Sequence, residues 1–306
     1  MRSSLERAIA RLAADHRSSA TALLRGAIDV LGRAGAAGGA DLAAAARGVC
    51  LAQPAMGSLW NAAAAALAGP DTLDRFAHQT ARAPDAIARA ARPLVEAGAG
   101  RPLVLVTWSA SGPVRRLLET LAGAGPLSVR CAEARPALEG RSLAAAVARA
   151  GARVEVFADG ALAAALDGAA AVVVGADAVT TEWFVNKAGT RALALAAAAG
   201  GVPTYVLAGR DKGLGPELAR HLRLRDGPAA EIWARRPRGV KARNPYFERV
   251  PWSDVAALVT DRGVVGAADV GELCRAMAAA VGQLDLARLL NSVSFRPSPA
   301  GGTRLL

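Results

Sequence analysis

Apolar residues in the first hundred positions recur every three or four residues, as they do along one face of an α-helix. The first two apolar stripes consist of Leu5, Ile9, Leu12 and Ala13, and of Leu23, Leu24, Ile28 and Leu31. Three further helical segments are expected over 41–51, 57–68 and 70–94, separated by proline and glycine. Nothing in this region alternates as a strand does, so we expect a helical N-terminal domain over residues 1–98.

The pattern changes after the glycine-rich stretch 98–102. Short apolar runs now alternate with helical stretches, and this order is typical of a parallel, doubly wound sheet. We therefore expect the α/β class, with a Rossmann-like parallel-sheet domain over residues 99–306. The expected strands are 103–106, 127–131, 153–157, 171–174 and 204–207, and the expected helices are 113–122, 140–150, 161–166 and 187–199.

The last sixty residues contain fewer clear signals. A turn is expected at Asn244-Pro245-Tyr246-Phe247, followed by a helix start at Ser253-Asp254. The stretch 255–265 is apolar, and residues 266–290 have helical spacing. From about residue 295 the chain is rich in Pro, Gly and Ser, so we expect a mobile tail.

Composition indicates a globular chain with a large core. Of its 306 residues 53% are hydrophobic, and the formal net charge is +11. A basic balance permits nucleic-acid binding, but arginine is scattered along most of this chain. The one dense basic group is Arg235, Arg236, Arg238, Lys241 and Arg243. We therefore interpret the charge as a solvated surface and do not expect nucleic acid as a partner.

Cysteine and histidine are too dispersed to form a metal site or a disulfide framework. Cys131 falls inside an expected strand, which favours an inert buried thiol. The N-terminus carries charges throughout, unlike a signal peptide, and no run of 18 apolar residues is uninterrupted. We expect cytoplasmic residence, no membrane contact, no metal and no cofactor.

Parallel sheets bind ligands at the carboxyl ends of their strands, beside the N-termini of helices. The first such turn holds Ser109, Ser111 and Gly112, followed by Pro113. Small hydroxyl residues and glycine at a helix start suit an anion-binding loop. The same residues also suit a simple helix cap, and the sequence favours this second interpretation when the turn is taken alone.

The second turn contributes Arg135. Its planar guanidinium can bind a phosphate or carboxylate through two parallel hydrogen bonds. An internal ion pair with Glu133 or Glu139 is an equally good interpretation.

The stretch 172–207 reads as a complete crossover unit with polar residues at its tip. Asp177 follows the first strand, and Asn186 and Lys187 stand where a helix is expected to begin. A lysine at such a position suits a phosphate, while Asp177 either orients a ligand hydroxyl or caps a turn. Trp183 and Phe184 close over a ligand or pack against a partner subunit.

These turns together resemble one protein family, over about residues 50–265. It contains the alpha, beta and delta subunits of eukaryotic translation initiation factor 2B, methylthioribose-1-phosphate isomerase and ribose-1,5-bisphosphate isomerase. The resemblance implies a helical domain followed by a Rossmann-like domain, and dimers formed through the C-terminal domain. The matching segments are 54–61 (PAMGSLWN), 107–112 (TWSASG), 133–136 (EARP), 139–140 (EG), 175–177 (GAD), 186–190 (NKAGT) and 244–248 (NPYFE).

The chain departs from the isomerases of this family at three positions. Their catalytic cysteine corresponds to Ser109. Their catalytic aspartate precedes the Asn-Lys pair, where this chain has only Glu182 as a substitute. Their phosphate-binding arginine corresponds to Gln53. A serine hydroxyl is a far weaker acid than a thiol, so these changes weaken the isomerase interpretation.

Three hypotheses follow for the function. The chain binds a phosphorylated sugar or nucleotide through Ser111, Gly112, Arg135, Asp177, Asn186 and Lys187, as a homo-oligomer without the isomerase chemistry. Alternatively, it is an aldose–ketose isomerase of a sugar 1-phosphate that uses Ser109 and Glu182. The third possibility is a purely structural subunit of a larger complex.

Overall fold

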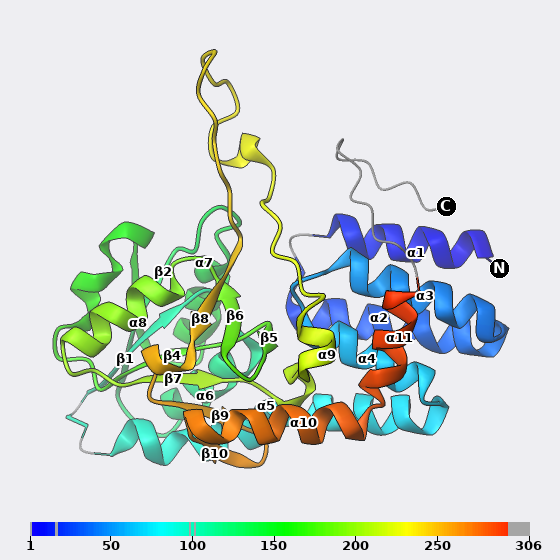
Figure 1. Ribbon diagram of the computed structural model, residues 1–306. Helices are drawn as coiled ribbons and strands as arrows, with labels where there is room; N and C mark the ends of the chain where they lie inside the picture. The colour runs from blue at the N-terminus through cyan, green and yellow to red at the C-terminus, as the bar shows by residue number, and fades with distance from the viewer. Residues whose placement is uncertain (1, 16–17, 98, 101, 293–306) are drawn as a thin grey trace.

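A computed structural model describes residues 2–15, 18–97, 99–100 and 102–292 (Figure 1). The tail expected to be mobile from about residue 295 lies outside the described residues. The first part of the chain forms helices, as the apolar periodicity predicts. Their bounds are α1 (Arg2–Ala14), α2 (Ala20–Ala37), α3 (Gly39–Ala52), α4 (Gly57–Leu67) and α5 (Pro70–Glu96).

Helix α4 lies at the centre of the helical layer. Every residue from Gly57 to Ala66 is buried, and most are alanine or other small residues. Small side chains let neighbouring helices approach closely, and α2, α3, α5 and α11 all contact α4. The alanine-rich composition is therefore explained by a helix that is surrounded on all sides.

The predicted parallel sheet is confirmed, and all five expected strands are present. They are β1 (Leu103–Trp108), β2 (Leu127–Ala132), β3 (Arg153–Phe157), β4 (Ala171–Val174) and β7 (Thr204–Leu207). The complete sheet has the order β10-β9-β7-β4-β1-β2-β3, and only β10 runs antiparallel to its neighbour.

Helices cover both faces of this sheet, because alternate strand residues point to opposite sides. Leu105 and Val173 face α5, α6 (Gly112–Ala122) and α7 (Glu139–Arg149). Val106 and Val174 face α8 (Thr190–Ala199), α10 (Val270–Ala280) and the 3₁₀ segment η1 (Asp159–Leu166). Both faces are therefore apolar, and the carboxyl edge is left for polar residues.

The strand order reverses direction between β1 and β4. The chain proceeds from β1 outward through β2 to β3, then returns to place β4 on the other side of β1. A crevice at the carboxyl edge is the usual ligand site at such a switch point. The loop 109–111 and the loop 175–177 lie beside it.

Two expectations about local structure are wrong. A helix was expected to start at Ser253-Asp254, but the chain makes one 3₁₀ turn there, η4 (Trp252–Asp254), and continues into β9 (Ala257–Thr260) and β10 (Gly263–Val265). Lys187 was expected to start a helix, but it ends strand β6 (Trp183–Lys187). This strand pairs with β5 (Ala178–Val179) and β8 (Phe247–Pro251) in a small antiparallel sheet. Pairing with distant strands overrides local helix propensity here.

The end of the described chain packs back onto the helical layer. Leu218 in α9 (Pro216–Ala219) and Leu286 in α11 (Gln283–Asn291) share a core with α4. Asn61 is fully buried and donates to the carbonyls of Asp211 and Gly213, at 2.7 and 2.9 Å. Gln283 donates to Asn61 Oδ1 at 2.6 Å. The buried amides therefore tie the two parts of the chain together.

Within the described ranges, no helix combines the length and the apolar character needed to cross a membrane.

Candidate functional site

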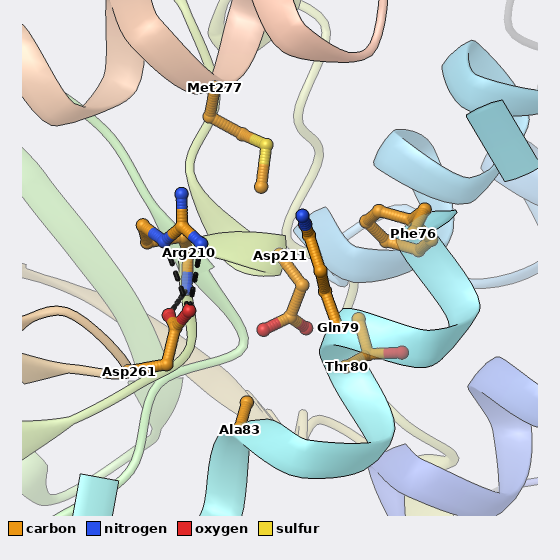
Figure 2. A pocket seen from close by; sticks show the side chains of 8 residues that line it. All are labelled: Phe76, Gln79, Thr80, Ala83, Arg210, Asp211, Asp261 and Met277. Atoms are coloured by element: carbon orange, nitrogen blue, oxygen red, sulfur yellow. Dashed lines mark hydrogen bonds and ion pairs between the residues drawn. The ribbon is translucent and has the colours of Figure 1, made fainter. Parts of the chain in front are cut away.

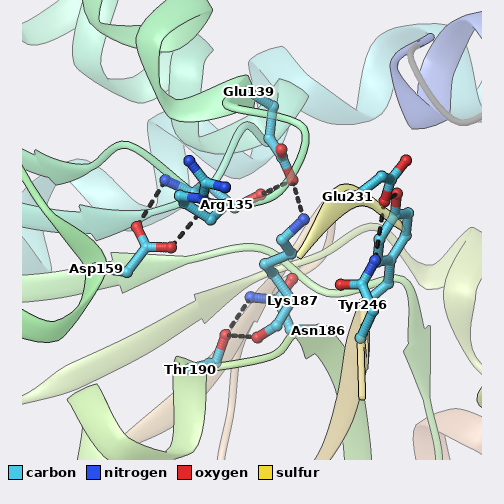
Figure 3. A network of polar contacts seen from close by, with 11 residues as sticks. Arg135, Glu139, Asp159, Asn186, Lys187, Thr190, Glu231 and Tyr246 are labelled. Carbon is cyan, nitrogen blue, oxygen red and sulfur yellow. Dashed lines mark hydrogen bonds and ion pairs between the residues drawn. The ribbon is translucent and has the colours of Figure 1, made fainter. Parts of the chain in front are cut away.

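Lys187 at the end of β6 and Glu139 at the start of α7 meet at the carboxyl edge of the sheet (Figure 3). Lys187 Nζ lies 2.8 Å from Glu139 Oε1, and Ser109 Oγ donates to the same oxygen at 3.1 Å. Only 6% of the lysine side chain is exposed. A buried ammonium needs an anion beside it, and Glu139 supplies that charge in this structure.

The loops that carry this cluster have strained backbones. Ser109, Ala134 and Leu138 are left-handed, with φ of 63°, 61° and 60°. Such conformations are costly for residues other than glycine and concentrate at ligand sites. All three follow the carboxyl end of β1 or β2.

Glycine allows two close approaches that fix the cluster. A Cβ at Gly140 would lie 1.9 Å from the carbonyl oxygen of Ala132, so α7 starts tightly against the end of β2 and places Glu139. A Cβ at Gly189, where φ is 105°, would lie 2.2 Å from the Trp108 ring. Both positions therefore require glycine.

The ring of Tyr246 packs against the ammonium of Lys187. Lys187 Nζ lies 4.9 Å from the centre of its ring, which is within range of a cation–π interaction. The hydroxyl of Tyr246 bonds to Glu231 Oε2, and Asn244 donates to the same oxygen at 2.9 Å. Burial, and then the contact with Glu231, raise the pKa of Tyr246. The phenol therefore stays neutral and serves as a donor to Glu231.

Several buried polar atoms near this edge have no hydrogen-bond partner among the described residues. They include Ser111 Oγ, Glu139 Oε2, Trp108 Nε1 and Thr107 Oγ1. Ser111 occupies the N-cap position of α6, but its hydroxyl makes no capping bond. This geometry does not support the helix-cap interpretation of the first turn. A ligand with donors and acceptors would satisfy groups that are otherwise costly to bury.

Asp177 follows β4 at the same edge. Its carbonyl accepts a hydrogen bond from Gly57 N at 2.8 Å, so it joins the helical layer to the sheet. Burial raises the pKa of its carboxyl above the usual 3.8, although Lys212 and Lys187 act in the opposite direction. Lys212 itself donates to the carbonyl of Ala176.

Arg135 projects from the β2–α7 loop. Its backbone N–H donates to Asp159 Oδ2 at 2.7 Å, and the residue is exposed. The two carboxylates considered as its partners are used elsewhere. Glu133 binds Arg141 at 2.7 Å, and Glu139 binds Lys187. Among the described residues the internal ion pair of Arg135 is therefore absent, and its guanidinium is available to a ligand.

Asn186 and Lys187 point to opposite faces of β6, since strand residues alternate. Asn186 donates to Thr190 Oγ1 at 2.9 Å and holds the start of α8. Figure 3 shows it directed away from Glu139. Its amide therefore holds the turn between β6 and α8 and does not face Glu139.

Glu182 lies at the far end of the same strand. It is exposed in the turn before β6, five residues from Lys187, or about 16 Å along an extended chain. The structure does not bring it to Ser109. Phe184 packs against Trp252, with ring centres 4.9 Å apart, and Trp183 lies against Arg249. The ring contacts of these two aromatics are therefore with Trp252 and Arg249, and not with Lys187.

Gln53, which stands where the isomerases have an arginine, faces the helical layer. Its amide donates to the carbonyls of Leu12 and Asp15, at 2.8 and 3.1 Å. Its amide therefore closes the end of α1. Burial also raises the pKa of the Cys131 thiol to about 11, in agreement with an inert cysteine. No cluster of three or more metal-ligating side chains occurs among the residues described.

The sequence missed Glu139, Tyr246 and Lys212 as members of this site. Glu139 was considered only as a partner for Arg135, and Tyr246 only as part of a turn. Their positions relative to Lys187 depend on which loops the strand order brings together. The one available signal was that Glu139 and Tyr246 both belong to segments of the family resemblance.

A small hollow lies apart from this cluster, between α5, α10 and the loop after β7 (Figure 2). It measures about 10 Å³, room for roughly one water molecule. Arg210 binds Asp261 there at 2.9 Å, and burial raises the pKa of Asp211. This hollow is too small for a sugar phosphate.

Known proteins match most of the chain. A translation initiation factor eIF-2B subunit 2-like protein of Pyrococcus furiosus is 30% identical over 223 residues, which is 69% of this chain and 76% of that protein. The methylthioribose-1-phosphate isomerase of Gemmatimonas aurantiaca is 39% identical over 145 residues, covering 45% of this chain and 42% of the isomerase.

Solved structures show the same fold. The translation initiation factor eIF-2B of Pyrococcus horikoshii OT3 superimposes with a TM-score of 0.72 at 23% identity, covering 85% of this chain and 96% of the other. A chain of the tetrameric eIF2B-beta2-delta2 complex of C. thermophilum gives 0.68 at 18% identity, with 90% and 94% covered. The initiation factor 2 subunit family model matches residues 9–267. The chain therefore belongs to the initiation factor 2 subunit family.

Proposed function

We propose that this chain binds a phosphorylated sugar or nucleotide at the carboxyl edge of its sheet and does not catalyse the isomerisation of its enzymatic relatives. The observation that carries the proposal is the buried Lys187 ammonium near the switch point of the sheet, beside unpartnered buried polar atoms. A phosphate would bind this lysine, and the exposed Arg135 is free to reach the ligand from the neighbouring loop.

The missing catalytic groups support the second half of the proposal. Ser109 stands in the position of the cysteine, and Glu182 is remote from it. Aldose–ketose isomerisation moves protons between two carbons and needs positioned acids and bases. Without these acids and bases, the site retains the groups for binding a ligand but not those for the isomerisation.

Isomerase activity is the second candidate function, and one contact favours it. Ser109 donates to Glu139 at 3.1 Å, so a carboxylate other than Glu182 is placed beside the serine. In that case the altered catalytic pair would be Ser109 and Glu139.

Assembly into homo-oligomers is also proposed. Its support is the family membership and the complex formed by the C. thermophilum relative, which is a tetramer of beta and delta subunits. The apolar stretch 255–265 gives less support than its composition implies, since Leu258 and Val259 are buried in the sheet and Val264 is its one exposed large apolar side chain. Light scattering at micromolar concentration tests this, and a monomer would contradict it.

The binding proposal is tested by thermal shift over a panel of sugar phosphates and nucleoside monophosphates. A ligand at a hundredfold excess over its Kd stabilises the native state by about 2.7 kcal/mol. The shift should disappear in Lys187→Met and persist in Arg25→Met, which removes an exposed cation on α2. Equal shifts in both variants would place the phosphate elsewhere.

A further inference from the structure

A long arm stands away from the body of the molecule between α9 and β8 (Figure 1). Its root is closed by a bridge between Asp226 and Pro245, and by the bond from Gly227 N to the carbonyl of Asn244 at 2.7 Å. Asn244 also donates to the carbonyl of Pro228 at 2.9 Å. We define the arm as residues 229–243. The root is well ordered by hydrogen bonds, whereas the arm beyond it has little contact with the body.

The arm is exposed along its length. Every residue from 231 to 241 is exposed, including apolar side chains that a folded chain usually covers. Ile232 is 47% exposed, Trp233 48% and Val240 44%. Trp60, Trp108 and Trp252 are each at most 6% exposed, so Trp233 is unusual among the tryptophans of this protein.

The arm also carries an uncompensated positive charge. Arg235, Arg236, Arg238 and Lys241 have no ion pair recorded among the described residues. By contrast, Arg243 at the root binds Asp226. Arginines elsewhere on the surface are often paired, as Arg115 is with Glu119 and Arg141 with Glu133. The dense basic group of the sequence therefore stands on the arm largely without acidic partners.

We propose that this arm binds single-stranded nucleic acid. Charge complementarity favours a polyanion over the equally basic arm of a second copy. Guanidinium groups bind phosphates through two hydrogen bonds, and an exposed indole stacks on an unpaired base. Both groups occur together at Trp233 and the following arginines, where Arg236 also donates to the Trp233 carbonyl at 2.6 Å.

The shape of the arm favours a single strand over a duplex. Proteins commonly read duplex grooves with a helix or a strand ribbon. The arm contains only one three-residue 3₁₀ turn, η3 (Ala229–Glu231), and no paired strand. An irregular cationic segment with one aromatic residue suits a flexible backbone with accessible bases.

The test is fluorescence anisotropy of a labelled 20-nucleotide oligouridylate titrated with the full-length protein. Four phosphate contacts predict a slope of log K against log salt of about −2.8, or roughly a 50-fold loss of affinity between 50 and 200 mM salt. The triple variant Arg235→Ala/Arg236→Ala/Arg238→Ala should reduce the slope to about −0.7 and weaken binding at least tenfold at 50 mM salt. Binding should also quench tryptophan emission in the wild type and not in Trp233→Phe.

The control is Arg7→Ala/Arg11→Ala/Arg25→Ala, which removes the same charge from exposed positions on the N-terminal helices. This variant should bind as the wild type does. Four results would overturn the proposal: no binding at 50 mM salt, an equal loss in both triple variants, no quenching, or equal binding of polyglutamate or an RNA duplex. Light scattering that shows an oligomer broken by the arm variant alone would instead make the arm a contact between copies, and would also overturn it.

Discussion

Glu139 Oε1 lies 2.8 Å from Lys187 Nζ and accepts a hydrogen bond from Ser109 at the same time. The lysine expected to hold a phosphate is thus already paired with a carboxylate. An anionic ligand must replace Glu139 at this position or bind beside it. The pair therefore controls how strongly the site attracts phosphate.

Glu139→Gln should strengthen the binding of ribose 5-phosphate about tenfold, equivalent to roughly 1.4 kcal/mol, because the ligand no longer competes with a carboxylate for Lys187. Isothermal titration calorimetry measures this directly. Glu133→Gln is the matched control, since its carboxylate binds Arg141 on the same loop. Weaker binding in Glu139→Gln would show that Glu139 itself holds the ligand.

Asp177 should make the protein less stable as the pH rises. Burial raises the pKa of this carboxyl above the usual 3.8, so the folded state retains the proton more strongly than the unfolded state. Its favourable contribution is complete below about pH 3.8 and is lost as the pH rises through the folded pKa. Urea denaturation between pH 4 and 8 should show Asp177→Asn gaining stability relative to the wild type. A difference in stability that stays constant with pH would contradict this explanation.

Purified protein should show little or no turnover of ribose 1,5-bisphosphate and methylthioribose 1-phosphate. The loss of one positioned acid–base group costs about 100- to 10,000-fold in rate, and this chain lacks both family groups. Glu182→Gln should change nothing, since Glu182 is far from Ser109. Robust turnover that collapses in Glu139→Gln would identify an isomerase with a rebuilt catalytic pair.

Gly189→Ala should destabilise the fold by about 2–4 kcal/mol. The backbone there has φ of 105°, and an added Cβ would lie 2.2 Å from the Trp108 ring. Gly201→Ala separates the two causes, since Gly201 has φ of 70° with open space around it. That variant should lose only about 1 kcal/mol, from backbone strain alone. Equal losses in urea denaturation would mean that the contact with Trp108 contributes nothing.

Local patterns were sufficient for the helices and for the central strands. The expected strands 153–157, 171–174 and 204–207 agree with β3, β4 and β7 residue for residue. The last two are short, mostly apolar runs, and 153–157 alternates charged and apolar residues, and both patterns predict strands. The helix start expected at Ser253-Asp254 was wrong. The apolar residues that follow suit either a helix or a strand, and pairing with β7 makes Ala257–Thr260 a strand.

By itself, the sequence determined the order of helices and strands, the buried faces and the turns that carry polar residues. These depend on interactions between near neighbours in the chain, which a periodic pattern records. Only the tertiary structure decided that Lys187 meets Glu139, that Asn186 and Glu182 lie away from Ser109, and that the basic group 235–241 stands on an exposed arm. Those relationships depend on strand order and loop geometry, which bring together residues as far apart in the chain as Glu139 and Lys187 and leave no local pattern.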